Sequence, residues 1–427
     1  MVKSYRFSQT VARFFRKNRS WLPWEQVPDP RKRRGRRWSL PQMLQTLLAG
    51  LVVLKGSMRA LDAALTEGDG ALAQLGAGVR IPDATLQATV PQVKPEGIRQ
   101  VLVDWVRQAL RNKVWDDPPR RPGDPRPLRF AAIDGKNVYT GKEASNEYSQ
   151  RTRPGGVLVR YLNRVLRVLW IGPGPRLVLD QRPIAADSND MGTLIPLLEQ
   201  MEESYGDMSF LEGISVDAGM TSKKNADAID ARSLAYVMSL KGNQPELFAE
   251  AKRVLLPLAQ TTSPEAETRE RYQGKVITRQ FWRTAEMEAW TGWPHLRQVW
   301  LVRQTTEHSD GRIEVEDRFF LSSLLWNRVS TKQFLALVRQ HWWIENQCFW
   351  RLDVDFDEEH PWSTKGWGPL VMGVLLCLAF NLLHLLRDRT LRGERPPWES
   401  FVSFVGLVEK ALVYGAGYEA GRRAAVY

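Results

Sequence analysis

The amino-acid sequence predicts a mixed α/β protein with an α-helical N-terminal domain, a sheet flanked by helices, and a β-rich insertion before a late helix. Helical apolar patterns fill residues 1–115, and a proline-rich stretch covers 116–127. Proline at that density permits neither a helix nor a central strand, so we expect 116–127 to be a linker. Short apolar runs alternate with amphipathic stretches over 128–390, which we expect to form one domain with an insertion at about 245–328. Residues 391–427 are expected to form a helical tail.

The N-terminal domain carries a dense basic segment. The chain has 427 residues and a formal net charge of +12, an excess that attracts phosphate backbones or anionic membranes. Tryptophans interleave with basic residues in the first forty positions, which suits phosphate contact combined with stacking. We therefore expect DNA contact here, with a solvated charge run as the alternative. The expected DNA-binding residues are Arg31, Lys32, Arg33, Arg34, Arg36 and Arg37.

The central domain has a recognisable order of predicted elements. Three strands are expected at 128–136, 158–170 and 176–184, followed by a helix at 189–204, a strand at 211–217, a helix at 222–234 and a strand at 235–240. Three consecutive strands followed by helix, strand, helix and strand is the order of an RNase H-like mixed sheet. In that layout Asp134 and Asp217 lie on neighbouring central strands.

Three carboxylates stand out because of where they are placed. Asp134 and Asp217 each end a short apolar run, and Glu345 lies in a helical segment over 331–352. On a period of 3.6 residues Glu345 shares a stripe with His341 and Cys348, so we expect it to face the side on which the helix packs. Each acid alone is explained equally well by a buried ion pair. Together they need cations, and a pair of divalent metal ions is the simplest solution.

The remaining patterns limit the classes of protein to which the chain can belong. Alternating β-type runs at 276–282, 298–303 and 313–321 form the insertion, whose tryptophans are expected in the core or on a stacking surface for a base. The apolar stretch at 369–386 is interrupted by Asn381 and His384 and falls short of the roughly 20 residues that a bilayer requires, so we expect a buried helix and no membrane contact. No apolar segment follows the first residues, so no signal peptide is expected. Cys348 and Cys377 fit buried thiols in a reducing compartment. These features suit a cytoplasmic, nucleoid-associated protein.

Several short motifs resemble a known family. They are Asp134-Gly-Lys136, Ser188-Asn-Asp190, Val216-Asp-Ala218, Leu240-Lys-Gly-Asn-Gln244 and His341-Trp-Trp-Ile-Glu-Asn346. This set resembles the DDE transposases of bacterial insertion sequences, in particular the subgroup of the H-repeat-associated proteins. The resemblance extends from about Phe7 to Arg387. The chain departs from the usual pattern at Trp343, where the family has glycine, and at Asn137, where it has threonine.

The resemblance implies an activity and a set of partners. It implies that Asp134, Asp217 and Glu345 hold two Mg²⁺ or Mn²⁺ ions, cleave DNA at the ends of a mobile element and transfer the freed 3′-OH into target DNA. The implied partner is double-stranded DNA, both inverted-repeat ends and target, bound by a homodimer on paired ends. Two alternatives remain open: an RNase H-fold nuclease, such as a resolvase, that cuts without joining, and a DNA-binding descendant that has lost the chemistry.

Residues next to the three acids are weaker candidates. Lys136, Lys241 and Asn346 are expected to contact phosphate or orient a ligand, with surface or capping roles as the alternative. His341 lies one helical turn before Glu345, so it is a candidate second-shell partner of that acid, with a packed core histidine as the alternative.

Overall fold

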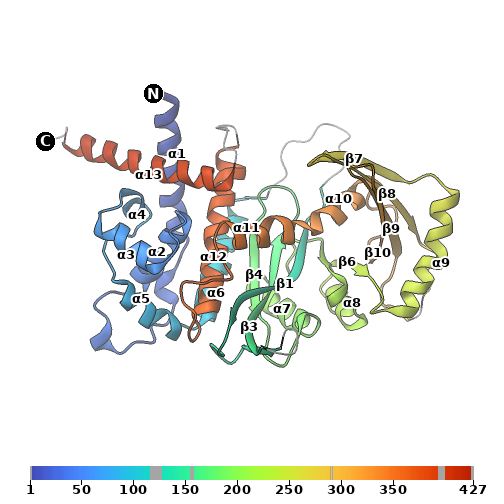
Figure 1. Ribbon diagram of the computed structural model, residues 1–427, viewed down its shortest axis with the longest axis horizontal. Helices are drawn as coiled ribbons and strands as arrows, with labels where there is room; N and C mark the ends of the chain where they lie inside the picture. Colours follow the sequence, from blue (N-terminus) through green and yellow to red (C-terminus); the bar gives the residue numbers. More distant parts are fainter. Residues whose placement is uncertain are drawn as a thin grey trace.

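The structure of the protein is a computed structural model, in which residues 2–115, 127–153, 158–288, 290, 292–392 and 400–424 are described. Helices from both ends of the chain gather at one side, and one mixed sheet extends from them through the rest of the molecule (Figure 1). The expected linker at 116–127 lies almost wholly outside the described residues. Its last residue, Pro127, precedes the first strand.

The N-terminal region is helical, as expected. Its helices are α1 (Val2–Arg19), α2 (Leu40–Val52), α3 (Met58–Thr66), α4 (Gly70–Gln74), α5 (Asp83–Thr89) and α6 (Pro95–Arg111), with short 3-10 turns η1 (Trp24–Gln26), η2 (Arg33–Gly35) and η3 (Val90–Gln92). The start of α2 follows from its sequence: the Ser39 hydroxyl accepts the Gln42 N–H at 3.3 Å, and the Gln42 side chain accepts the Ser39 N–H at 3.1 Å. This reciprocal cap satisfies N–H groups that have no partner within the helix.

One sheet contains every long strand of the described residues. Its members are β1 (Phe130–Gly141), β2 (Gln150–Thr152), β3 (Arg160–Trp170), β4 (Val178–Pro183), β5 (Gly213–Val216), β6 (Ala235–Leu240), β7 (Ala266–Tyr272), β8 (Lys275–Thr284), β9 (Gln298–Glu307) and β10 (Ile313–Ser322). The strand order is β2-β3-β1-β5-β6-β10-β9-β8-β7, and β4 also pairs with β3.

The centre of the sheet has the predicted RNase H-like order. Strands β4, β3 and β1 are antiparallel, whereas β1, β5 and β6 are parallel. Helix α7 (Asp190–Tyr205) connects β4 to β5, and α8 (Lys223–Asp230) connects β5 to β6. The prediction that Asp134 and Asp217 belong to neighbouring central strands is confirmed by the β1–β5 pairing.

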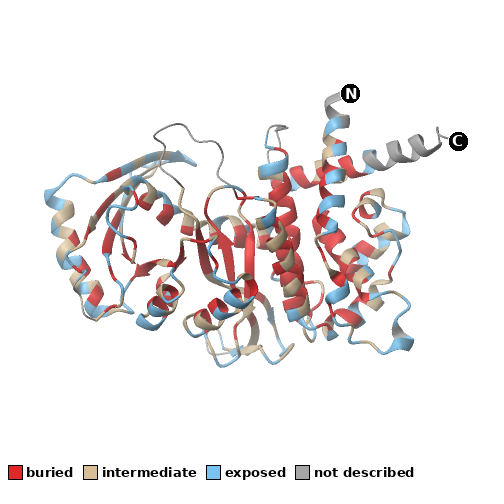
Figure 2. Ribbon diagram, turned by 180° about the vertical axis from the view of Figure 1, so that it is seen from behind, coloured by how far each residue is buried: buried red, intermediate tan, exposed pale blue. Residues whose placement is uncertain are grey.

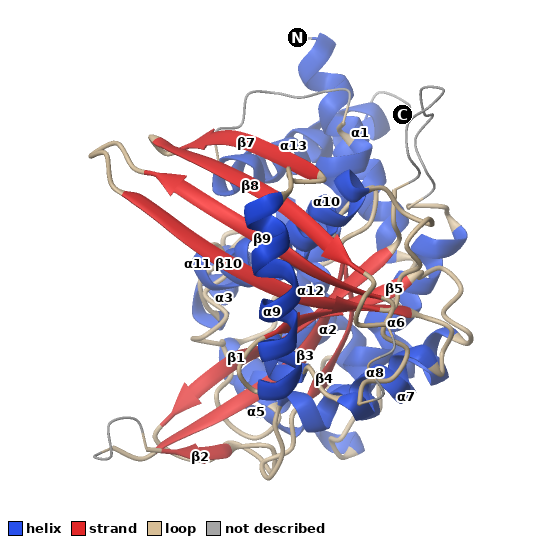
Figure 3. Cartoon of the chain, turned by 90° about the vertical axis from the view of Figure 1, so that its right-hand side faces the viewer, coloured by secondary structure: helices blue, strands red, loops and turns tan. Residues whose placement is uncertain are grey.

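The insertion contains two elements that were not predicted. It begins with a long helix, α9 (Pro245–Thr261), and includes the additional strand β7. It continues the central sheet, because β10 pairs with β6 (Figure 3). That pairing satisfies the backbone groups along what would otherwise be an open edge of β6.

The helix expected at 331–352 is broken into three pieces. Helix α10 (Thr331–His341) is followed by a π-helical segment, η6 (Ile344–Phe349), and by α11 (Trp350–Val354). In η6 the Trp350 N–H bonds to the Glu345 carbonyl, a spacing of five residues. A π-helical turn widens the helix and changes its periodicity, and such turns are frequent at functional sites.

Helix α12 (Gly368–Leu385) joins the two halves of the molecule. It contacts α2 and α6 on one side and β1 and β4 on the other, and all of its residues are buried (Figure 2). It continues through η7 (Leu386–Thr390), and α13 (Phe401–Ala424) then packs against α1. The helix over 368–390 is long and apolar enough to cross a membrane, which corrects the expected length, but its most apolar window is entirely buried. The prediction of a buried helix is therefore confirmed.

Candidate active site

We expected Asp134 to lie at the end of its strand, but the strand continues beyond it. Strand β1 continues along β3 as far as Gly141, but β5 pairs with β1 only over 130–133. Asp134 is therefore the first residue of β1 beyond the β5 pairing. Its side chain accepts a hydrogen bond from the Gly135 N–H at 2.7 Å.

Asp217 occupies the equivalent position on the neighbouring strand. Ile133 of β1 is in register with Val216 of β5, so Asp134 and Asp217 each follow the last paired residue. Neighbouring strands lie about 4.8 Å apart. The fold therefore brings together two carboxylates that are far apart in the sequence.

Glu345 faces solvent, and the expectation that it lies on the packing side of its helix is wrong. The residue is exposed, whereas Ile344 and Cys348 on the same segment are buried. The expectation assumed 3.6 residues per turn, and the π-helical turn of η6 breaks that period. Desolvation of the carboxyl group and then the charge of Asp217 raise the pKa of Glu345, whereas Lys241 and Arg318 lower it. Glu345 therefore lies within electrostatic reach of Asp217.

A fourth acid, Asp190, belongs to the same site and was not predicted as a site residue. It is the first residue of α7 and forms an ion pair with Arg164 at 2.9 Å. A Cβ atom at Gly135 would lie 2.7 Å from the Asp190 carboxyl group, so a side chain at this position would force the carboxyl group to move. The sequence signal was Asn189, which caps α7 and thereby places Asp190 in the first turn.

The site concentrates negative charge. Burial raises the pKa of Asp134 to about 7, and the charges of Asp217, Glu345 and Asp190 add to the rise. Burial and the charge of Asp190 also raise the pKa of Asp217, against the effect of Lys241. Within the described part of the chain, Asp134, Asp217 and Glu345 form no ion pair. Lys241 and Arg318 offset part of this charge, but acids held close together without an ion-pair partner of their own favour binding of an external cation.

The donor atoms suit a hard divalent cation. Carboxylate oxygens are the ligands that Mg²⁺ and Mn²⁺ prefer. Over the described ranges, no three acidic, histidine or cysteine side chains lie close enough to hold one ion as they stand. Binding would therefore require the side chains of Asp134, Asp217 and Glu345 to turn toward each other.

In metal-free protein we expect Asp134→Asn to be more stable than wild type at about pH 8 and equally stable below about pH 4. The pKa of Asp134 rises from 3.8 to about 7 on folding, so the folded protein keeps a proton that the unfolded chain releases between these values. Wild-type stability therefore falls as pH rises through this window, at about 1.4 kcal/mol per pKa unit and on the order of 2–4 kcal/mol in total. Asparagine does not titrate. Urea unfolding across this range measures the difference, and a difference independent of pH contradicts the prediction.

The neighbouring candidates lie in different surroundings. Lys136 forms ion pairs with Asp353 and with Glu359, the latter at 3.5 Å, and its side chain is largely buried. Lys241 is exposed directly after β6, and its charge lowers the pKa of Asp217 and of Glu345. Asn346 is exposed beside Glu345. Contact of these three residues with phosphate stays a prediction.

His341 lies in the core. It is 2% exposed, its Nδ1 has no hydrogen-bond partner, and burial lowers its pKa to about 4. Its ring packs edge-to-face against Trp342. These surroundings are those of a packed core histidine, the alternative to a second-shell role that was left open above.

The basic loop, residues 31–37, divides into two groups. Arg31 donates to Asp29 and to the Trp38 carbonyl, and Arg36 donates to the Arg31 carbonyl, so these two arginines hold the loop together. The other four basic side chains are exposed and form no ion pair with the described residues: Lys32, Arg33, Arg34 and Arg37.

We expect the triple variant Arg33→Ala, Arg34→Ala and Arg37→Ala to bind duplex DNA more weakly and with less dependence on salt. Each lost phosphate contact reduces the slope of log K against log salt concentration by about 0.9. The melting temperature should stay unchanged because these side chains are exposed. Fluorescence anisotropy at several salt concentrations measures the slope. Arg253→Ala, which removes an exposed arginine of α9, is the control, and an unchanged slope in the triple variant refutes a DNA contact by this loop.

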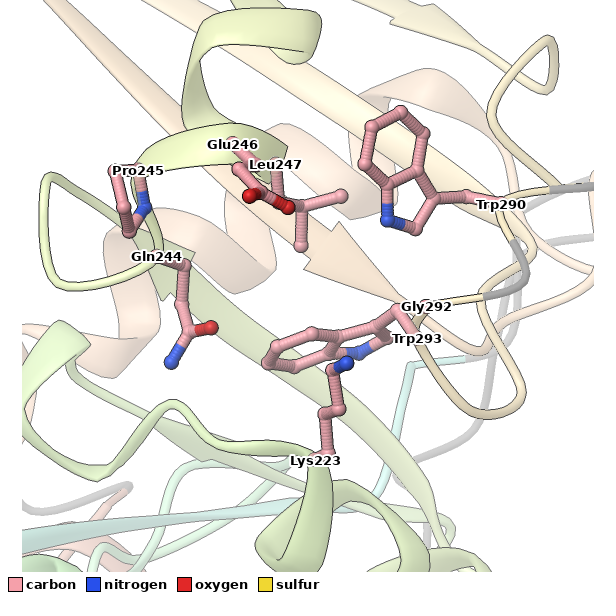
Figure 4. A pocket seen from close by; sticks show the side chains of 8 residues that line it. All are labelled: Lys223, Gln244, Pro245, Glu246, Leu247, Trp290, Gly292 and Trp293. Carbon is pink, nitrogen blue, oxygen red and sulfur yellow. The ribbon is translucent and has the colours of Figure 1, made fainter.

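A cavity of about 600 Å³ opens beside the segments that follow β5 and β6 (Figure 4). Trp290 and Trp293 line one side of it, Gln244 and Leu247 lie opposite, and Lys223 reaches its rim. Trp293, like Trp282 and Trp300, is buried, whereas Trp290 is partly exposed. A partly exposed indole next to a lysine suits a nucleobase with an adjacent phosphate.

The protein has an RNase H-like sheet with acids at the ends of the pairing between two adjacent parallel strands, and a later helix presents a glutamate. This is the arrangement expected above for a DDE transposase. The profile of the family described as "Transposase DDE domain" matches residues 125–382, more than half of the chain. The chain belongs to this family.

Two relatives found by sequence agree with this assignment. The H repeat-associated protein YhhI of Escherichia coli (strain K12), provisionally named a transposase, is 23% identical over 316 residues, covering 72% of this chain and 74% of YhhI. YncI of Escherichia coli O157:H7, also provisionally named a transposase, is 27% identical over 316 residues, covering 72% of this chain and 71% of YncI. Among solved structures, the piggyBac transposase synaptic complex with hairpin DNA aligns with a TM-score of 0.43 and 10% identity, over 98% of this chain and 80% of that one.

Proposed function

We propose that this protein is a DNA transposase that cleaves the ends of a mobile element and joins the freed 3′-OH to target DNA. The observation that carries the proposal is the in-register placement of Asp134 and Asp217 beside the exposed Glu345. Family membership supports the same reaction class.

The proposed site assigns a role to each acid. Asp134, Asp217 and Glu345 would hold two Mg²⁺ or Mn²⁺ ions. Such a pair, when bound, supplies Lewis-acid stabilisation of the attacking and leaving oxygens of a phosphodiester. Asp190 is neutralised by Arg164, so it adds less charge to the site than the other three acids. Lys241 carries a positive charge at the same edge of the sheet, where it is placed to attract a DNA phosphate.

The proposed DNA substrate is double-stranded, comprising the inverted-repeat ends and the target. The exposed side chains of the basic loop supply sequence-independent phosphate contacts. Cutting and joining two ends requires two active sites, so we propose that the protein acts as a homodimer on paired ends.

A cleavage and strand-transfer assay tests the proposal. The substrate is a linear duplex containing the genomic DNA that flanks the gene, with a pre-cut version to isolate joining. We expect cleavage in Mg²⁺ or Mn²⁺, loss of cleavage in EDTA, and insertion of the pre-cut end into a plasmid. Cleavage without insertion identifies a nuclease or resolvase. DNA binding without cleavage identifies a DNA-binding protein without chemistry, and either result overturns the proposal.

A further inference from the structure

We propose that Arg176 is a positioning residue for Glu345, which holds the π-helical turn that presents this carboxylate to the active site. The inference rests on the proposed function. Arg176 lies in the β3–β4 turn, far from Glu345 in the sequence, and it would control the position of this third acid of the site.

One guanidinium group spans the turn that carries Glu345. The Arg176 guanidinium carbon lies 3.5 Å from the centre of the Trp343 ring, and Nη1 donates a hydrogen bond to the Gln347 side-chain oxygen. Trp343 and Gln347 lie two residues before and two residues after Glu345. Arg176 therefore contacts a residue on each side of Glu345 without contacting the Glu345 carboxylate itself.

The turn that carries Arg176 is itself fixed to the core. The Trp170 indole donates to the Pro173 carbonyl at 2.8 Å, and the Trp115 indole donates to the Pro175 carbonyl at 2.8 Å. Both indoles are buried and pack against each other. Because these bonds fix the turn, Arg176 has a fixed position relative to the sheet. It can therefore hold the Glu345 segment at a fixed position as well, which a residue on a mobile loop would not do.

The surroundings of Arg176 indicate that it is not there for stability alone. Among the described residues it forms no ion pair, its Nε is buried without a hydrogen-bond partner, and burial lowers its pKa to about 10. A cation kept in such a place is less stabilising than an apolar side chain of similar size. Its contacts to Trp343 and Gln347 are the compensation that the structure shows.

A second arginine acts on the other side of the same segment. The Arg318 guanidinium of β10 lies 5.1 Å from the centre of the Trp342 ring. Two consecutive tryptophans are thus each covered by an arginine, one from the β3–β4 turn and one from β10. The π-helical turn has the weaker hydrogen bonding of an uncommon helix type, and arginines from two separate parts of the sheet, the β3–β4 turn and β10, contact the tryptophans that precede it.

The test compares full-length variants of Arg176 with a matched arginine elsewhere. Arg176→Met keeps the length of the side chain but removes the charge and the planar group, and Arg176→Lys keeps the charge alone. Arg339→Met is the control, because Arg339 of α10 pairs with Glu270 at 2.6 Å and lies outside the 343–347 turn. End cleavage is measured against Mn²⁺ concentration, and Mn²⁺ binding is measured separately as the rise in melting temperature on adding the ion.

We expect Arg176→Met to cleave roughly 10–100-fold more slowly than wild type and to need about tenfold more Mn²⁺ for half-maximal activity, which is the range for residues that orient metal ligands. The stabilisation by Mn²⁺ should shrink, while DNA affinity stays unchanged. Arg176→Lys should behave like Arg176→Met because lysine cannot both stack and bond to Gln347. Trp343→Phe, which keeps an aromatic surface, should retain most of the activity.

Other outcomes separate this inference from the proposed function. If wild type cleaves DNA and Arg176→Met shows the same Mn²⁺ dependence, the positioning role is refuted. The positioning role is also refuted if Arg176→Met has a lower melting temperature but an unchanged rate of end cleavage per folded molecule. If wild type neither cleaves nor gains stability from Mn²⁺, the proposed function itself fails.

Discussion

Asp217→Asn is expected to abolish end cleavage, with a loss of roughly a thousandfold or more, which corresponds to about 4 kcal/mol of transition-state stabilisation. The substitution keeps the shape of the side chain but replaces a charged oxygen ligand with an amide. Burial already raises the pKa of Asp217, so a neutral side chain is tolerated by the metal-free fold. Cleavage of the flanking-DNA duplex in Mg²⁺, normalised to DNA binding, measures the effect.

The control for this substitution is Asp187→Asn, which changes the same chemical group on an exposed residue just before α7. It should cleave at the wild-type rate. Asp217→Asn protein that binds DNA and still cleaves within tenfold of wild type would remove Asp217 from the proposed metal site.

Glu358→Ala is expected to lower the free energy of unfolding by about 3–5 kcal/mol, because it leaves a buried arginine without its partner. Arg167 is 0% exposed and donates to both carboxylate oxygens of Glu358, at 2.7 and 3.1 Å. Gln181 accepts further hydrogen bonds from Arg167 but carries no charge. Urea unfolding at neutral pH measures the loss.

A double variant separates the lost partner from lost packing. Arg167→Met with Glu358→Leu removes both charges and keeps the site filled, so it should recover most of the stability. The exposed ion pair between Arg253 and Glu250 is a control, since its removal should change the free energy of unfolding far less than Glu358→Ala does. A Glu358→Ala protein as stable as wild type would show that Arg167 finds another partner.

The sequence predicted the centre of the sheet and the pairing of two acids because both follow from local signals. A short apolar run that ends in a carboxylate marks a buried strand at the point where it emerges, and this happens at Asp217 and, on one side of the strand, at Asp134. The order of strands and helices then fixes which runs become neighbours. The basic loop was also visible from composition, although coordinates were required to show that Arg31 and Arg36 bond to the loop itself.

Other features depend on tertiary contacts that no local pattern reports. The exposure of Glu345 results from a π-helical turn, and the period of a regular helix gives the opposite orientation. The Asp190 carboxyl group lies where a Cβ atom at Gly135, on a strand distant in sequence, would displace it. The pairing of β10 with β6, which merges the insertion with the central sheet, is a long-range contact of the same kind.

The burial of α12 has a mechanical consequence. Its side chains fill a continuous core that extends from Val11 among the first helices to Leu412 near the end of the chain. The basic loop and the carboxylates are therefore joined through one continuous core. Under the proposed function, DNA bound by the loop would meet the acids at an angle set by the fold, and the distance between the two cleavage points would be set by how two copies of the protein associate.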